Sequence, residues 1–164
     1  MHLYLHHSFF VGGQGKFCVC FRPCEKVGAE HLSFNTSCHS VEEAAETVGA
    51  SPEDFVKSIC LLDQAGNLIV GVVKGEARVS TSRVGKILGI ERPRTALPEE
   101  ILEKTGYPCG GTPPFGFEAL FLIDPKVTEK EFVYAGGGSE TSLLRVPPEE
   151  LQRANGGKVV RIRK

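Results

Sequence analysis

Residues 106–116 constrain the fold of this chain more than any other stretch. They read GYPCGGTPPFG, with four glycines and three prolines in eleven residues, which excludes a helix or a regular strand. A predicted helix precedes them and the apolar run Ala119–Ile123 follows, so we expect an ordered loop inside one domain. Glycine leaves backbone N–H groups accessible and proline holds them in place, which suits an anion or a developing oxyanion. A purely structural turn fits the composition equally well.

The rest of the chain predicts an α/β domain. Residues 57–63 and 68–73 are apolar runs joined by QAGN, and we expect them to form a hairpin buried on both faces. Further strands are expected at 119–123, 132–134, 142–146 and, as an edge strand, 158–163. Helices that start at caps or prolines and end near glycines are expected at 40–48, 51–54, 80–88, 98–105 and 147–154. This order predicts a single domain with a mixed, curved β-sheet surrounded by short helices.

Composition supports one soluble globular domain. The 164 residues are 24% charged and 41% hydrophobic, with a net charge of -1. Basic residues gather in 74–94 and again in 158–164, which suits docking of a polyanion on one face or, alternatively, ordinary solvated helix faces. No apolar run approaches the ~20 residues of a membrane span, and no basic region precedes an apolar leader, so we expect a cytoplasmic protein without membrane contact.

Cysteine and histidine usage argues against a metal site. The chain is long enough to fold without disulfides and has no CxxC pair, so its six cysteines are expected to be reduced thiols. A cluster near the N-terminus matches no common zinc spacing, and we expect neither a metal nor a cofactor. Its members are Cys18, Cys20, Cys24, His2, His6 and His7.

One lysine stands at the start of the predicted hairpin. Lys57 lies beside Ile59 and Leu61 in an otherwise apolar strand. Its ammonium group either snorkels to solvent or is held there to face an anion, and the residues alone favour snorkelling.

Five motifs in order resemble the YbaK/EbsC-type aminoacyl-tRNA deacylase family, whose fold also forms the editing insertion of bacterial prolyl-tRNA synthetases. They are HSVEEAA at 39–45, FVKS at 55–58, LEKTGYPCGGTPPFG at 102–116, YAGGG at 134–138 and PEEL at 148–151. The resemblance runs from about residue 38 to residue 163. It predicts a deacylase domain over 38–164, preceded by an atypical segment over 1–37.

The resemblance implies hydrolysis of a mischarged tRNA, usually tRNA specific for proline that carries alanine or cysteine. It implies that Lys57 is the main essential side chain, beside the terminal adenosine and its phosphate. It also implies that Gly110 and Gly111 act in catalysis at the ester carbonyl. The positions assigned to substrate binding are Thr112, Gly136, Gly137, Gly138 and His39.

The chemistry is compatible with so few side chains, because an aminoacyl ester is already activated. It needs a placed water and donors for the oxyanion more than a strong nucleophile. In the family a hydroxyl of the terminal ribose is proposed to orient that water. The partners implied are the 3′ acceptor end of aminoacyl-tRNA and prolyl-tRNA synthetase.

Two other functions remain open from the sequence. One is a non-catalytic regulatory module of the same fold that holds a tRNA end or a nucleotide, and the other is a metal-binding protein built on the N-terminal segment. For the glycines we expect backbone, not a side chain, to line the ester at Gly111 and Gly137, so that valine there acts on catalysis more than on folding. The alternative is that both glycines only turn the chain, and then valine costs stability and activity together.

Overall fold

Two buried strands form the centre of the fold. β2 (Val56–Leu62) pairs antiparallel with β3 (Leu68–Lys74) along its whole length, from Val56 opposite Lys74 to Leu62 opposite Leu68. The computed structural model describes residues 27–38 and 40–164, and it confirms the expected hairpin. All residues of β3 except the last are buried, as its apolar run predicts. Each such aliphatic side chain contributes about 1.5–3 kcal/mol by leaving water.

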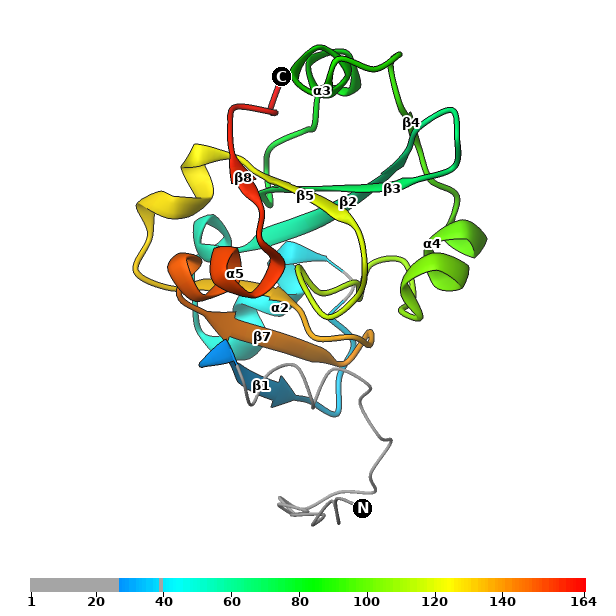
Figure 1. Ribbon diagram of the computed structural model, residues 1–164. Coiled ribbons are helices and arrows are strands. Elements are labelled where there is room, and N and C mark those ends of the chain that lie inside the picture. Colours follow the sequence, from blue (N-terminus) through cyan, green and yellow to red (C-terminus); the bar gives the residue numbers. More distant parts are fainter. Residues whose placement is uncertain (1–26, 39) are drawn as a thin grey trace, which may run out of the picture.

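The other strands extend this hairpin into a mixed sheet and form a second sheet below it (Figure 1). The five-stranded sheet has the order β4-β2-β3-β5-β8, with parallel pairing of β3 to β5 and of β5 to β8. The three-stranded sheet has the order β1-β7-β6 and is antiparallel. These strands are β1 (Glu30–Ser33), β4 (Arg94–Thr95), β5 (Leu120–Ile123), β6 (Val133–Gly136), β7 (Ser142–Val146) and β8 (Lys158–Val159).

The predicted single curved sheet is thus divided in two, joined at one point. A single parallel bridge connects Phe55, just before β2, to Tyr134 on β6. The two rings stack with centroids 5.0 Å apart. The backbone ladder goes no further than this bridge, and the two sheets separate to enclose a shared apolar core.

Three apolar clusters hold the layers together. The largest lies between the two sheets and includes Val70, Leu144 and Phe115. A second lies between the five-stranded sheet and α3 (Thr81–Leu88), which covers that sheet at the top of Figure 1. A third packs α2 (Val41–Val48) against β7 and the Phe55–Tyr134 joint.

The helices begin and end where local chemistry predicts. Ser40 accepts the N–H of Glu43 at the start of α2, and Ser80 accepts that of Arg83 at the start of α3. Both helices stop at a glycine with positive φ, Gly49 and Gly89. The remaining helices are η1 (Pro52–Asp54), α4 (Pro98–Thr105), η2 (Pro125–Glu129) and α5 (Pro148–Asn155).

The expected edge strand over 158–163 is wrong in length. Only Lys158–Val159 pair with β5, although β8 does lie at the edge of the sheet. Beyond it the N–H groups of Ile162 and Arg163 donate to the Asp124 carboxylate, at 3.1 and 3.2 Å. A side-chain acceptor therefore replaces the ladder to β5, while the segment bridges to Val79 on its other side.

Strand β1 was not predicted from the sequence. It pairs with β7 from Glu30 opposite Arg145 to Ser33 opposite Ser142, in a segment that shows no strand periodicity. The division at residue 38 stays a prediction, and β1 lies before it. Among the described residues, no helix is long and apolar enough to cross a membrane.

Candidate functional site

Lys57 lies on the outer face of β2. Side chains alternate along a strand, so Lys57 shares its face with Ile59 and Leu61, which pack in the cluster beneath α3. The residue is half-buried and stands opposite Val73 of β3. Within the described part of the chain its ammonium group makes no hydrogen bond or ion pair. The lysine is thus placed at an apolar surface with its charge available to a ligand.

The joint between the sheets sets the position of Lys57 relative to β6. The parallel bridge pairs Phe55 with Tyr134. Lys57 and Gly136 each stand two residues after one of the bridged residues, on β2 and on β6. The bridge therefore brings the start of β2, which carries Lys57, next to the strand that leads into the glycine-rich turn.

The two predicted glycine loops touch through their backbones. The N–H of Gly138 donates to the carbonyl of Gly111 at 2.8 Å. A Cβ added to Gly136 would lie 2.7 Å from the Thr112 carbonyl oxygen and 3.0 Å from that of Gly111. Because no side chain fits between them, glycine at 136 is a condition for this contact.

The loop before Thr112 is a tight turn closed on Pro108. Its carbonyl accepts the N–H of Gly111 at 3.0 Å and the hydroxyl of Thr112 at 3.1 Å. Gly110 has φ 89°, the value that the third position of a type II turn requires. Thr112 is buried, with 6% of its surface exposed. The turn fixes the direction of the backbone N–H groups of Gly110 and Thr112.

Not every predicted glycine amide is available to a ligand. The N–H groups of Gly111, Gly137 and Gly138 donate to carbonyls of Pro108, Ser142 and Gly111. Those of Gly110 and Thr112 donate to no acceptor among residues 27–38 and 40–164. If the loop serves an anion, these two amides are its donors.

The structure favours the steric explanation for two glycines. A Cβ on Gly137 would lie 2.5 Å from the carbonyl carbon of Ser142, and one on Gly111 would lie 3.0 Å from the backbone of Ser139. At both glycines the Cβ position points into neighbouring backbone. Valine at these positions would therefore disturb folding and activity together, which is the second of the two readings left open by the sequence.

Three contacting residues were missed by sequence reasoning. His31 on β1 places Nε2 3.0 Å from the carbonyl oxygen of Gly137. The hydroxyls of Ser139 and Ser142 lie 2.7 Å apart, and the Ser142 hydroxyl also accepts the N–H of Ser139 at 3.2 Å. The serines follow the triple glycine in the sequence and could have been noticed there. His31 had no such signal, because it depends on β1 pairing with β7.

His39, which was predicted to bind the substrate, lies outside the described residues. The Cys/His cluster at residues 2–24 also lies outside them. In the described part of the chain, no group of three His, Cys, Asp or Glu side chains is arranged to hold a metal ion. The three cysteines in the described part of the chain, Cys38, Cys60 and Cys109, are free thiols. Burial raises the pKa of Cys60 to about 11, so this thiol stays protonated at neutral pH.

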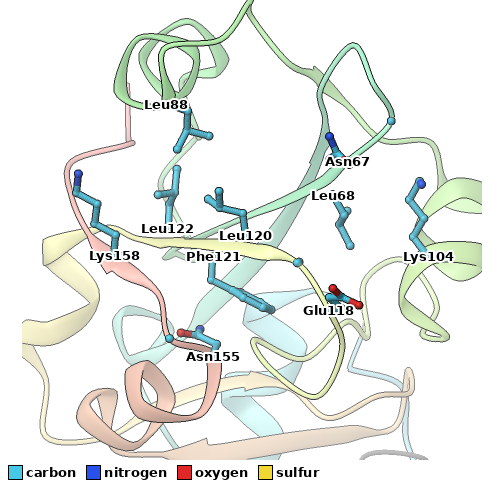
Figure 2. Close-up of a pocket in the computed structure, with 13 residues that line it drawn as sticks. Asn67, Leu68, Leu88, Lys104, Glu118, Leu120, Phe121, Leu122, Asn155 and Lys158 are labelled. Carbon is cyan, nitrogen blue, oxygen red and sulfur yellow. The ribbon is translucent and has the colours of Figure 1, made fainter.

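A large pocket lies elsewhere among the described residues. It has a volume of about 790 Å³ and lies where the β2–β3 turn meets the start of β5 and the ends of α4 and α5. Figure 2 shows Leu88, Leu120 and Leu122 on its apolar side, with Lys104 and Lys158 at its flanks. It includes neither Lys57 nor either glycine loop.

Comparison with known proteins shows the family of this chain. A model of the aminoacyl-tRNA editing domain family matches residues 35–154. The uncharacterized protein YwhH of Bacillus subtilis (strain 168) is 31% identical over 128 residues, which cover 77% of this chain and 81% of YwhH. Proline--tRNA ligase of Thermotoga maritima is 30% identical over 106 residues, which cover 64% of this chain but 18% of the ligase.

Solved structures show the same fold. The crystal structure of a candidate trans-editing enzyme for prolyl-tRNA synthetase has a TM-score of 0.81 and 27% identity, covering 91% of this chain and 99% of that one. A hypothetical protein of known structure has a TM-score of 0.79 and 31% identity, over 86% of this chain and 96% of the other. The fold is that of the class of editing-domain proteins. This chain belongs to the aminoacyl-tRNA editing domain family, as its motifs predict, and is homologous to the editing domain of prolyl-tRNA synthetases.

Proposed function

We propose that this protein is a free-standing deacylase that hydrolyses the ester of a mischarged tRNA. Its substrate is tRNA specific for proline carrying alanine or cysteine, and it works in the cytoplasm beside prolyl-tRNA synthetase. The observation that supports the proposal is the backbone contact of Gly111 with Gly136–Gly138, at the end of a strand whose Tyr134 is bridged to Phe55, two residues before Lys57. Family membership supports an editing role.

The step needs only placed donors and a water. The water oxygen attacks the ester carbonyl carbon, the bond from that carbon to the ribose oxygen breaks, and the ribose oxygen takes the proton. Free amino acid and intact tRNA result. In the proposal the N–H groups of Gly110 and Thr112 stabilise the oxyanion, because these amides have no acceptor in the described part of the chain.

Lys57 has a binding and positioning role in this scheme. Its cationic head, free of any ion pair in the described part of the chain, attracts the phosphate of the terminal nucleotide. Fixing that phosphate brings the ester over the loop formed by residues 110–112. Selection among small amino acids is then steric, and one methylene is worth only ~1–3 kcal/mol.

Replacing this lysine tests the proposal. We expect Lys57→Ala to reduce single-turnover hydrolysis of alanyl- and cysteinyl-tRNA specific for proline at least 100-fold. Its effect on folding should stay below about 1 kcal/mol, because the ammonium group has no partner to lose in the described structure. The matched control is Lys104→Ala, which removes an exposed lysine from the end of α4 and should keep the wild-type rate.

Two outcomes would contradict the proposal. Hydrolysis by Lys57→Ala at the wild-type rate would remove the proposed role of the lysine. Wild-type protein that binds these tRNAs but releases no amino acid would instead identify the non-catalytic tRNA-end module.

A further inference from the structure

Two basic segments that are far apart in the sequence lie side by side next to α3. Val79 and Arg163 form an isolated antiparallel bridge. The N–H of Ser80 donates to the carbonyl of Ile162 at 2.8 Å, and that of Lys164 donates to the carbonyl of Arg78 at 2.9 Å. Residues 78–80 and 162–164 therefore form one two-stranded ribbon that leads into the helix.

The basic side chains of residues 74–88 and 161–164 fall into two groups. Lys74 and Arg163 are already paired, with Glu76 at 3.7 Å and with Asp124 at 2.6 Å. The others make no ion pair with any carboxylate in the described part of the chain, and we call them the α3 basic surface. Its members are Arg78, Arg83, Lys86, Arg161 and Lys164.

The members of the α3 basic surface are mostly exposed. Val79 and Ile162 point into the sheet, against Gly71, so Arg78 and Arg161 beside them face outward. Arg83 is half-buried, and its Nε is enclosed without an acceptor in the described structure. An anionic group bound from outside does not reach this enclosed Nε, but it can pair with the rest of the guanidinium without breaking an ion pair of the described residues.

The α3 basic surface adjoins the candidate site. Gly71, on which Val79 packs, stands opposite Ile59 on β2. Ile59 is two residues from Lys57 and on the same face of the strand. A polymer whose end reaches Lys57 can therefore continue across α3.

We propose that the α3 basic surface docks the phosphate backbone of the duplex stem that follows the single-stranded 3′ end of tRNA. The inference rests on the proposed function, since the substrate end is placed at Lys57. Duplex nucleic acid presents closely spaced negative charges, and cations without acidic partners gain from neutralising them by counterion release. This contact recognises the phosphate backbone of the tRNA and does not discriminate among the amino acids esterified to it.

The test compares two triple variants with equal change in charge. Arg78→Ala/Arg161→Ala/Lys164→Ala removes three charges from the α3 basic surface. Lys104→Ala/Lys126→Ala/Arg153→Ala removes three exposed charges from other elements and is the control. Affinity for deacylated tRNA specific for proline is measured from low to physiological salt. Circular dichroism melts verify folding, and glutamine replaces alanine where a variant proves unstable.

We expect the α3 triple to bind tRNA at least tenfold more weakly at low salt. Its slope of log affinity against log salt should be smaller by roughly 2–3, at about 0.9 per lost phosphate contact. The control should keep the wild-type slope. Hydrolysis of an aminoacylated single-stranded oligonucleotide with the tRNA 3′ end should be unchanged in the α3 triple.

Failure of this proposal and failure of the proposed function give different results. If wild-type protein hydrolyses no ester while the α3 triple still loses tRNA affinity, the deacylase proposal fails and the docking surface stands. Equal weakening in both triples, or in neither, overturns the docking surface. Unchanged tRNA binding with lost binding to prolyl-tRNA synthetase also overturns it, and assigns the surface to a protein partner.

Discussion

Glycines at the contact between residues 110–112 and 136–139 are needed for two different reasons. Gly110 has φ 89° and open space where a Cβ would stand, so its requirement is conformational. Gly137 has no positive φ, but its Cβ position lies 2.5 Å from backbone of Ser142, so its requirement is steric. Single substitutions can therefore separate turn strain from overpacking.

We expect Gly137→Val to lower the free energy of unfolding by at least about 2 kcal/mol, because backbone cannot move aside as a side chain end can. Gly110→Ala should lower the free energy of unfolding by only about 1 kcal/mol, because a non-glycine residue is strained at positive φ. Urea denaturation of both variants measures the difference. A Gly137→Val protein as stable as wild type would show that the two loops separate readily.

Between elements, the joint of β2 with β6 determines whether the candidate site is assembled. It consists of one backbone bridge and the stacked rings of Phe55 and Tyr134, which lie 19° from parallel. Stacked aromatic pairs contribute about 0.5–1.5 kcal/mol beyond the area they bury. Since Lys57 and Gly136 each stand two residues after one of the rings, a shift of this joint moves the two residues relative to each other.

Phe55→Leu should therefore reduce deacylation as well as stability. We expect a loss of about 1–2 kcal/mol in unfolding free energy and a tenfold or greater fall in the single-turnover rate. Phe121→Leu is the matched control, because Phe121 is also buried, at 5% exposed against 3% for Phe55, but lies in the core between the sheets. It should lose similar stability and keep its rate. Equal loss of rate in both would contradict a positioning role for the joint.

At the scale of the whole molecule, Asp124 ties the C-terminal segment to the end of β5. Its carboxylate accepts the N–H groups of Lys126, Ile162 and Arg163 and pairs with the Arg163 guanidinium. Burial by itself would raise the pKa of Asp124, but these hydrogen bonds together lower the pKa below the usual value. The α3 basic surface depends on this tie, because Arg161 and Lys164 belong to the same segment.

The lowered pKa predicts a dependence of stability on pH. The contribution of Asp124 is fully present above the ordinary carboxyl pKa of about 3.9 and is lost as pH falls through the lower pKa of the folded state. Asp124→Asn should cost about 2–4 kcal/mol at pH 7, and the difference from wild type should shrink below about pH 4. Urea denaturation across this range measures it.

Asp54→Asn is the control for Asp124. The hydrogen bond to Lys130 lowers the pKa of Asp54 as well, but this pair lies at the surface, 3.0 Å apart, and should contribute less than about 1 kcal/mol. A difference between Asp124→Asn and wild type that stays constant down to pH 2 would contradict the charge-based explanation.

Sequence by itself determined the local elements and the family. The hairpin, the helix caps at Ser40 and Ser80, the glycine stops and the loop at residues 106–116 depend on neighbouring residues, whose conformational preferences can be read directly. The order of motifs was enough to predict the editing-domain family.

Tertiary structure alone decided how these parts meet. The pairing of β1 with β7, the Phe55–Tyr134 joint, the contact of Gly138 with Gly111 and the ribbon of residues 78–80 with 162–164 all join distant segments. It also decided which basic side chains form ion pairs and which backbone N–H groups donate hydrogen bonds within the protein. Such contacts depend on which long-range packing of the whole chain has the lowest free energy, and no local propensity contains that information.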